Sequence, residues 1–163
     1  MITLAQLLDS RDRRAARQRE LLEEYPSATL LCLTVQLPGS EKRTPESLVI
    51  ARAALKAIRE AFPESIMDEE RDLETGFEGY FIVDMPLADA KRSACRIEDT
   101  HPLGRLMDID VITSDGPLSR GAIGLPERRC LLCDKPARVC MRARSHTTSE
   151  LLQKIKELLT KYI

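Results

Sequence analysis

Residues 29–37, TLLCLTVQL, restrict the fold of this chain more than any other stretch. Nearly all of them are apolar or β-branched, and apolar and polar positions do not alternate. A short run of this kind, bounded by turn residues, is typical of a strand that is buried on both faces at the centre of a sheet. The rest of the chain must therefore provide strands beside it and helices that cover it.

Helix and strand patterns alternate along the remaining sequence. Apolar residues recur at helical spacing in residues 3–25, where Ser10 would begin a second helix as an N-cap. Thr44 caps the next helix, and Thr147 with Glu150 forms a capping box before the last one. The other expected helices cover 45–61, 86–99 and 136–144, and the other expected strands lie within 64–85, 106–113 and 117–123. This order predicts one α+β domain over residues 1–163, with helices packed on a mixed or antiparallel sheet.

Composition narrows the classes of partner. The net charge is −1 with 31% charged residues, which is not the balance of a general polyanion binder. Aromatic residues make up 4% and Trp is absent, so base-stacking platforms for nucleic acid are not expected. No apolar run approaches the roughly 18 residues that span a bilayer, and no signal peptide is evident. We therefore expect a cytoplasmic protein with reduced cysteines and neither a nucleic-acid nor a membrane partner.

Two aspartates define the candidate site. Residues 101–111, HPLGRLMDIDV, pass from a turn into a short apolar strand that contains Asp108 and Asp110. Alternate residues of a strand share a face, which places the two carboxylates on one side, about 7 Å apart at Cα. A hard divalent cation such as Mg²⁺ relieves the repulsion between two such groups and commonly shares its ligands with substrate phosphates. The alternative is a half-exposed strand with two solvated acids.

Basic residues crowd the segment that follows this strand. Between residues 117 and 144 the basic side chains exceed the acidic ones by five. A site for a triphosphate needs cations of this kind, so this segment is the expected phosphate-binding region. Lys42, in a loop between a strand and a helix, is a further candidate for phosphate, although an exposed basic turn explains it equally well. Five arginines between residues 11 and 19 indicate either a solvated helix face or a docking surface for an acidic partner.

Three cysteines and a histidine lie close together in the same basic segment. They are Cys130, Cys133, Cys140 and His146. The spacing departs from the usual zinc-finger patterns, so reduced thiols packed at a turn are the first interpretation. A structural Zn²⁺ site and a redox or nucleophilic role are the alternatives.

Several stretches together resemble one family. They are SRDRRAARQ at 10–18, LTVQLPGSEK at 33–42, HPLGRLMDIDV at 101–111, LSR at 118–120 and LPERRCLLCDKPARVCMRARSHTTSELL at 125–152. This combination resembles the apo-citrate lyase phosphoribosyl-dephospho-CoA transferases, also called citrate lyase holo-acyl-carrier-protein synthases, the CitX family. The resemblance is strongest from residue 101 onward and weak over 62–98.

The resemblance implies a nucleotidyl-transfer reaction. The 5-phosphoribosyl-3′-dephospho-CoA group would move from 2′-(5-triphosphoribosyl)-3′-dephospho-CoA to a serine of the citrate lyase acyl carrier subunit, with release of pyrophosphate. Catalysis would fall to Asp108, Asp110 and Arg105, with Mg²⁺ on the two aspartates. The residues expected to bind substrate phosphates are Gly104, Arg120, Arg128, Arg129 and Lys42. Two alternatives stay open, a metal-dependent nucleotidyltransferase with a different acceptor and a zinc-stabilised, non-catalytic adaptor.

Overall fold

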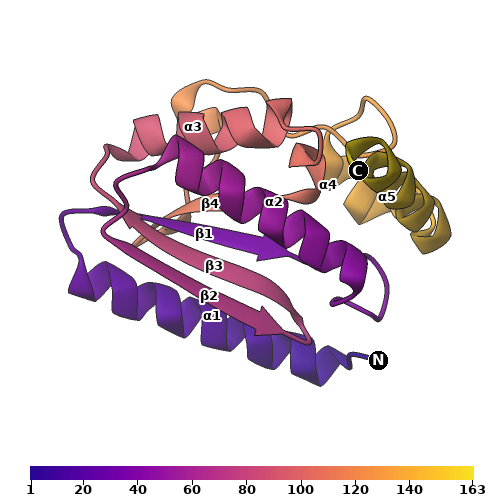
Figure 1. Cartoon of the computed structure of the whole chain (residues 1–163), viewed down its shortest axis with the longest axis horizontal. Coiled ribbons are helices and arrows are strands. Elements are labelled where there is room, and N and C mark those ends of the chain that lie inside the picture. Colours follow the sequence, from indigo (N-terminus) through magenta and orange to yellow (C-terminus); the bar gives the residue numbers. More distant parts are fainter.

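Strand β1 (Thr29–Val35) lies at the centre of a five-stranded sheet in the computed structural model, which describes residues 1–163 (Figure 1). Every residue of β1 except Thr34 is buried, which confirms the predicted central strand. The sheet has the order β2-β3-β1-β4-β5 and all neighbours are antiparallel. The other strands are β2 (Met67–Leu73), β3 (Gly76–Val83), β4 (Asp108–Thr113) and β5 (Gly116–Pro117).

Helices cover both faces of this sheet. Alternate residues of β1 point to opposite sides, and Leu31 and Leu33 contribute to the larger core beneath α2 (Pro45–Ala61) and α3 (Leu87–Thr100). Leu30 and Cys32 belong to a smaller cluster that is closed by Leu21 of α1 (Leu4–Glu24). Figure 1 shows α1 on one side of the sheet and α2 with α3 on the other. The predicted α+β architecture is thereby confirmed, with an antiparallel rather than a mixed sheet.

The helix ends follow the capping residues seen in the sequence. Thr44 and Thr147 each form a capping box, with Ser47 and Glu150 respectively. The prediction that Ser10 begins a new helix is wrong, because α1 runs unbroken from Leu4 to Glu24. The Ser10 hydroxyl instead donates to the carbonyl of Leu7 at 2.8 Å, a bond that a serine can make inside a helix.

The strand expected at 117–123 is also wrong. Gly116 and Pro117 pair with β4, the Leu118 N–H adds one bond to the carbonyl of Val111 at 2.8 Å, and the chain then enters a short 3₁₀ helix at Gly121–Ile123. Farther along that edge of β4, the N–H of Ile109 donates to the carboxylate of Glu98 at 2.9 Å. The outer edge of β4 around Ile109 is therefore closed by a side chain from α3 rather than by a strand.

The C-terminal part packs at one end of this layered body (Figure 1). Helix α4 (Ala137–Ala143) is followed by α5 (Thr148–Tyr162), whose Ile155 and Leu159 join the larger core. A 3₁₀ turn at Gly104–Leu106 connects α3 to β4. Helices α1 to α5 include none with the length and apolar character that a bilayer crossing requires.

Candidate active site

Strand β4 presents Asp108 and Asp110 on the same face of the sheet. They lie opposite Thr34 and Cys32 of β1, and the intervening Ile109 is fully buried in the larger core. The alternation predicted from the sequence is therefore present. Asp108 begins the strand and keeps 57% of its side chain exposed, whereas Asp110 is half-buried.

Neither carboxylate is neutralised by a close partner. No group donates a hydrogen bond to either of them, and the nearest ion pair joins Asp108 to Arg128 at 3.9 Å. Burial, and next the negative charge of Asp108, raise the pKa of Asp110 to about 6, although Lys91 of α3 opposes this shift. Burial likewise raises the pKa of Asp108, against the attraction of Arg128. The pair is thus held at a cost in free energy that a bound cation would relieve.

Glu98 connects this strand to the basic segment. Its carboxylate is buried and accepts the Ile109 N–H at 2.9 Å, Arg120 at 2.8 Å and Arg128 at 3.5 Å. Asp99 gives Arg120 a second carboxylate at 3.0 Å. Because both oxygens of Glu98 are engaged, this residue positions the arginines and the strand and is not free to bind a ligand.

Four arginines predicted from the sequence line one cavity of about 260 Å³. Three acidic side chains, those of Glu98, Asp99 and Glu127, share the lining with them. The four residues are Arg105, Arg120, Arg128 and Arg129. The structure therefore brings together side chains that lie up to 24 positions apart in the sequence.

Backbone carbonyls fix three of these guanidinium groups. Arg105 donates to the carbonyl of Cys130, and Arg129 donates to that of Asp134. Arg128 donates to the carbonyl of Gly104 at 3.1 Å and to the two further carbonyls of Arg105 and Met107. A guanidinium has five N–H donors, so bonds to a few carbonyls hold its direction and leave donors for an anion.

A second cavity of about 240 Å³ contains Asp108. Arg105 and Arg128 line it as well, together with the end of β1 and Leu131. The two cavities therefore meet at Arg105 and Arg128. One of them offers a carboxylate and the other offers a cluster of cations, and cations of this kind can offset charge on phosphate groups.

Two other residues predicted to bind phosphate already have hydrogen-bond partners within the chain. Gly104 is buried, and its N–H donates to the carbonyl of His101 at 2.9 Å, so it has no amide free for a phosphate. A Cβ at Gly104 would lie 2.4 Å from the carbonyl oxygens of Ile97 and Glu98, which shows that close packing demands glycine here. Lys42 lines neither cavity, and its ammonium donates to the carbonyl of Leu37 at 3.0 Å.

Comparison with known proteins identifies the family of this chain. The family model described as apo-citrate lyase phosphoribosyl-dephospho-CoA transferase, CitX, matches residues 2–162. The chain belongs to the CitX family. A probable apo-citrate lyase phosphoribosyl-dephospho-CoA transferase of Streptococcus pyogenes serotype M18 is 39% identical, over 97% of this chain and 85% of the relative. One of the same name from Vibrio cholerae serotype O1 (strain M66-2) is 37% identical, over 99% and 93%.

Sequence reasoning missed two charged residues of this CitX protein. Lys91 and Glu98 are seven positions apart on α3, so they lie on one side of the helix, next to the buried stripe that contains Ala90, Ala94 and Ile97. Both are buried, although charged residues are rarely so unless they are paired. The sequence did contain a signal for these two residues, because a lysine and a glutamate lie at the margin of the apolar stripe of α3.

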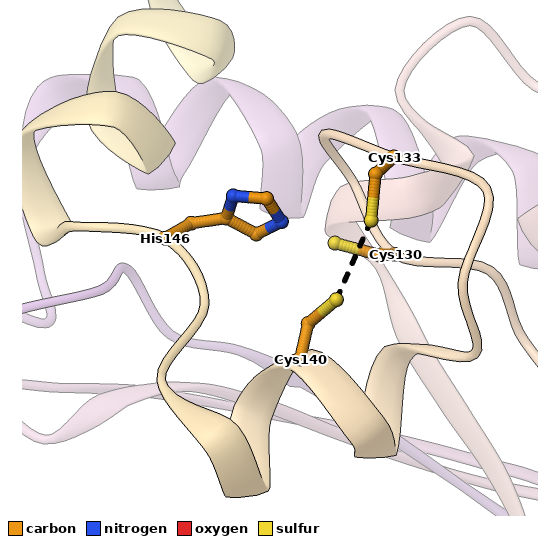
Figure 2. Close-up of side chains that lie close together, drawn as sticks. All are labelled: Cys130, Cys133, Cys140 and His146. Carbon is orange, nitrogen blue, oxygen red and sulfur yellow. Dashed lines mark hydrogen bonds between the residues drawn. The ribbon is translucent and has the colours of Figure 1, made fainter.

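The structure also gathers the cysteine and histidine side chains of the basic segment. The ligand atoms of Cys130, Cys133, Cys140 and His146 all lie within 4.8 Å of one another. Figure 2 shows the four side chains directed toward a common centre. All five cysteines of the chain are free. These four residues form a group that could hold a metal ion, at a place separate from the two aspartates.

Proposed function

We propose that this chain transfers the 5-phosphoribosyl-3′-dephospho-CoA group from 2′-(5-triphosphoribosyl)-3′-dephospho-CoA to a serine of the acyl carrier subunit of citrate lyase. The serine oxygen attacks the α-phosphorus of the triphosphate and forms a phosphodiester. The bond between that phosphorus and the oxygen bridging to the β-phosphorus breaks, and pyrophosphate leaves. The serine proton passes to water. The meeting of Asp108 with an arginine-lined cavity is the observation that carries this proposal.

The arginines hold the triphosphate and offset the charge on the departing pyrophosphate. Arg105 and Arg128, which line both cavities, contact the α-phosphate, and Arg120 and Arg129 contact the outer phosphates. Since carbonyls and Glu98 fix these side chains before substrate arrives, little reorganisation accompanies charge development. Gly104 supports this arrangement through close packing rather than by binding phosphate.

Asp108 and Asp110 are the residues that would hold a Mg²⁺ ion. Both side chains offer carboxylate oxygens as ligands, and no protein group donates a hydrogen bond to them. Burial also raises their pKa values. A hard cation therefore fits this pair of carboxylates. Such an ion supplies Lewis-acid polarisation of a phosphoryl oxygen and of the attacking hydroxyl. The chain itself orients the two carboxylates through the pairing of β4 with β1 and through the bond from Ile109 to Glu98.

The basic side of α1 is only partly available to an acidic carrier protein. Arg13, Arg14 and Arg17 form ion pairs with carboxylates of this chain. Arg11 and Arg19 are exposed. We place the carrier subunit where its serine reaches Asp108, and assign these two arginines at most a supporting contact.

Intact mass spectrometry of the carrier subunit tests the proposal. The carrier subunit is incubated with this protein, the triphosphoribosyl precursor and Mg²⁺, and its mass should increase by one prosthetic group. Asp108→Asn should abolish this gain, whereas Asp115→Asn, at the exposed turn between β4 and β5, is the matched control and should not. No gain from folded protein and authentic precursor would overturn the proposed reaction.

The remaining alternative is a nucleotidyltransferase with a different acceptor. Pyrophosphate release from an ordinary nucleoside triphosphate in the absence of the carrier subunit would support it. We expect no such release, because the proposed acceptor is the carrier serine. Membership of a transferase family also favours catalysis over the adaptor interpretation.

A further inference from the structure

The segment that carries the basic cavity has almost no apolar core of its own. Between Ile112 and Ile155 the only buried residues are Cys130 and Cys140. Helix α4 has seven residues, and its Val139 and Met141 are exposed. Segments with so little burial usually require a cross-link or a metal to adopt a single conformation.

The three cysteines approach one another from a loop and from helix α4. Cys130 and Cys133 lie in a tight loop that is closed by the bridge between Arg129 and Pro136 and by the Cys130 N–H donating to the carbonyl of Lys135 at 2.8 Å. Cys140 projects from α4 toward this loop (Figure 2). The Leu132 N–H donates to the Cys130 sulfur at 3.5 Å, an interaction that favours a thiolate.

His146 completes the group from the other side. Helix α4 ends at Ala143, and the left-handed backbone of the following Arg144 (φ 51°) turns the chain back toward the cysteines. The Nε2 atom of His146 is buried and has no hydrogen-bond partner. Figure 2 shows the ring nitrogen farther from the backbone directed toward the three sulfurs. A buried nitrogen without a partner indicates a ligand at that position.

The chemistry of the four ligand side chains determines which metal ion they would bind. Three thiols and one imidazole form a tetrahedral Cys₃His set, which suits Zn²⁺ and not Mg²⁺ or Ca²⁺. Zn–S bonds of about 2.3 Å in a tetrahedron separate the sulfurs by about 3.8 Å. The ligand atoms lie within 4.8 Å of one another and the sulfurs of Cys133 and Cys140 are 3.4 Å apart, so small side-chain rotations would reach this geometry.

We propose that Cys130, Cys133, Cys140 and His146 bind one structural Zn²⁺ ion that fixes the arginine-bearing loop. All four ligands come from the protein, so no position is open for substrate. Arg128 and Arg129 directly precede Cys130, and Arg105 donates to the Cys130 carbonyl. By fixing Cys130, the ion therefore stabilises the shape of the basic cavity without lining it. The inference that the ion shapes this cavity for substrate rests on the proposed phosphate-binding role of the cavity, whereas the inference that the four residues bind zinc does not.

Metal analysis of the purified protein, without an affinity tag, tests the site. We expect about one zinc ion per chain and three cysteines protected from thiol reagents until a mercurial displaces the metal. Cys133→Ser and His146→Asn should each lose most of the zinc. Cys95→Ala, which removes a buried cysteine of α3 outside the group, should retain it and is the matched control.

A second measurement uses the unmodified chain, in case the variants fail to fold. Strong chelation should lower the melting temperature, and added Zn²⁺ should restore it, whereas Mg²⁺ should not. In the transfer assay, chelated protein with Mg²⁺ restored should show a KM for the triphosphate precursor raised at least tenfold, with a smaller change in kcat. Absence of zinc together with no zinc uptake by reduced protein would overturn the site, as would a native Cys133–Cys140 disulfide. Zinc content and melting temperature do not depend on transfer, so they decide the metal site even if the proposed reaction fails.

Discussion

Replacing Asp110 with asparagine should stabilise the free protein at neutral pH and abolish transfer. Burial and the charge of Asp108 raise the pKa of Asp110 from 3.8 to about 6. The folded state therefore holds this proton more tightly than the unfolded state does. The resulting contribution to stability is complete below about pH 4 and is lost as the pH rises through about 6. Asparagine mimics the protonated side chain in size and charge, so the loss should disappear in the variant.

The size of the expected stabilisation follows from the shift in the pKa of Asp110. About two pKa units at about 1.4 kcal/mol each give an upper limit of about 3 kcal/mol. Because Asp110 is half-buried and water can relax around it, we expect about 1 to 2 kcal/mol of stabilisation at pH 8. In a domain of 163 residues this corresponds to a rise in melting temperature of about 2 to 8 °C. Between about pH 5 and pH 8 the same carboxyl should account for just under half of this total, about 0.5 to 1 kcal/mol, in the unmodified chain.

Urea unfolding at these two pH values, without added divalent metal, measures the effect. Asp110→Asn should flatten the pH dependence, and Asp115→Asn, at an exposed turn, should leave it unchanged. Added Mg²⁺ should stabilise the unmodified chain and not Asp110→Asn. A variant that is destabilised equally at both pH values would refute the reasoning, because it would show that the ionised carboxylate makes favourable contacts in the fold.

Other perturbations concern the packing around the site. Glu98→Gln removes the charge that holds two arginines and should lower the free energy of unfolding by about 2 to 4 kcal/mol in urea titration, while raising the KM for the triphosphate precursor. Gly104→Ala places a Cβ 2.4 Å from carbonyl oxygens of α3 and should lower the unfolding free energy by about 3 kcal/mol or more, whereas Gly121→Ala, whose nearest atom is 4.0 Å away, should change it by less than about 1 kcal/mol. Thr147→Ala removes a capping box and should reduce the melting temperature by about 2 to 4 °C in a calorimetric scan.

Sequence patterns correctly predicted the structural features that depend on interactions between neighbouring residues. The caps at Thr44 and Thr147, the buried run of β1 and the shared face of Asp108 and Asp110 are properties of a few neighbouring residues. Propensity and periodicity act over the same range, which is why these features could be predicted. The strand expected at 117–123 failed because a residue far away in the sequence, Glu98, takes its place on the edge of β4.

The candidate site was predictable in its composition but not in its organisation. An excess of arginine near the two aspartates indicated anion binding, and the structure shows that four of these arginines share one cavity. Which carbonyls fix them depends on the turn at Gly104 and on the path of the chain around Cys130. The cysteine group likewise depends on the left-handed turn at Arg144, which no local pattern in the sequence demands.

The free edge of β4 explains how these parts act together. If β5 were long, its backbone would occupy the Ile109 N–H, and Glu98 would be buried without that donor. Because β5 stops at Pro117, one carboxylate can bond both the strand that carries the aspartates and the arginines that line the neighbouring cavity. A displacement of α3 would therefore move the carboxylate pair and the cation cluster together, since Glu98 bonds to both. The cost of burying Glu98 is offset by these three partners, and Glu98 shares the link between the two halves of the site with Arg128, which also donates to the carbonyl of Met107.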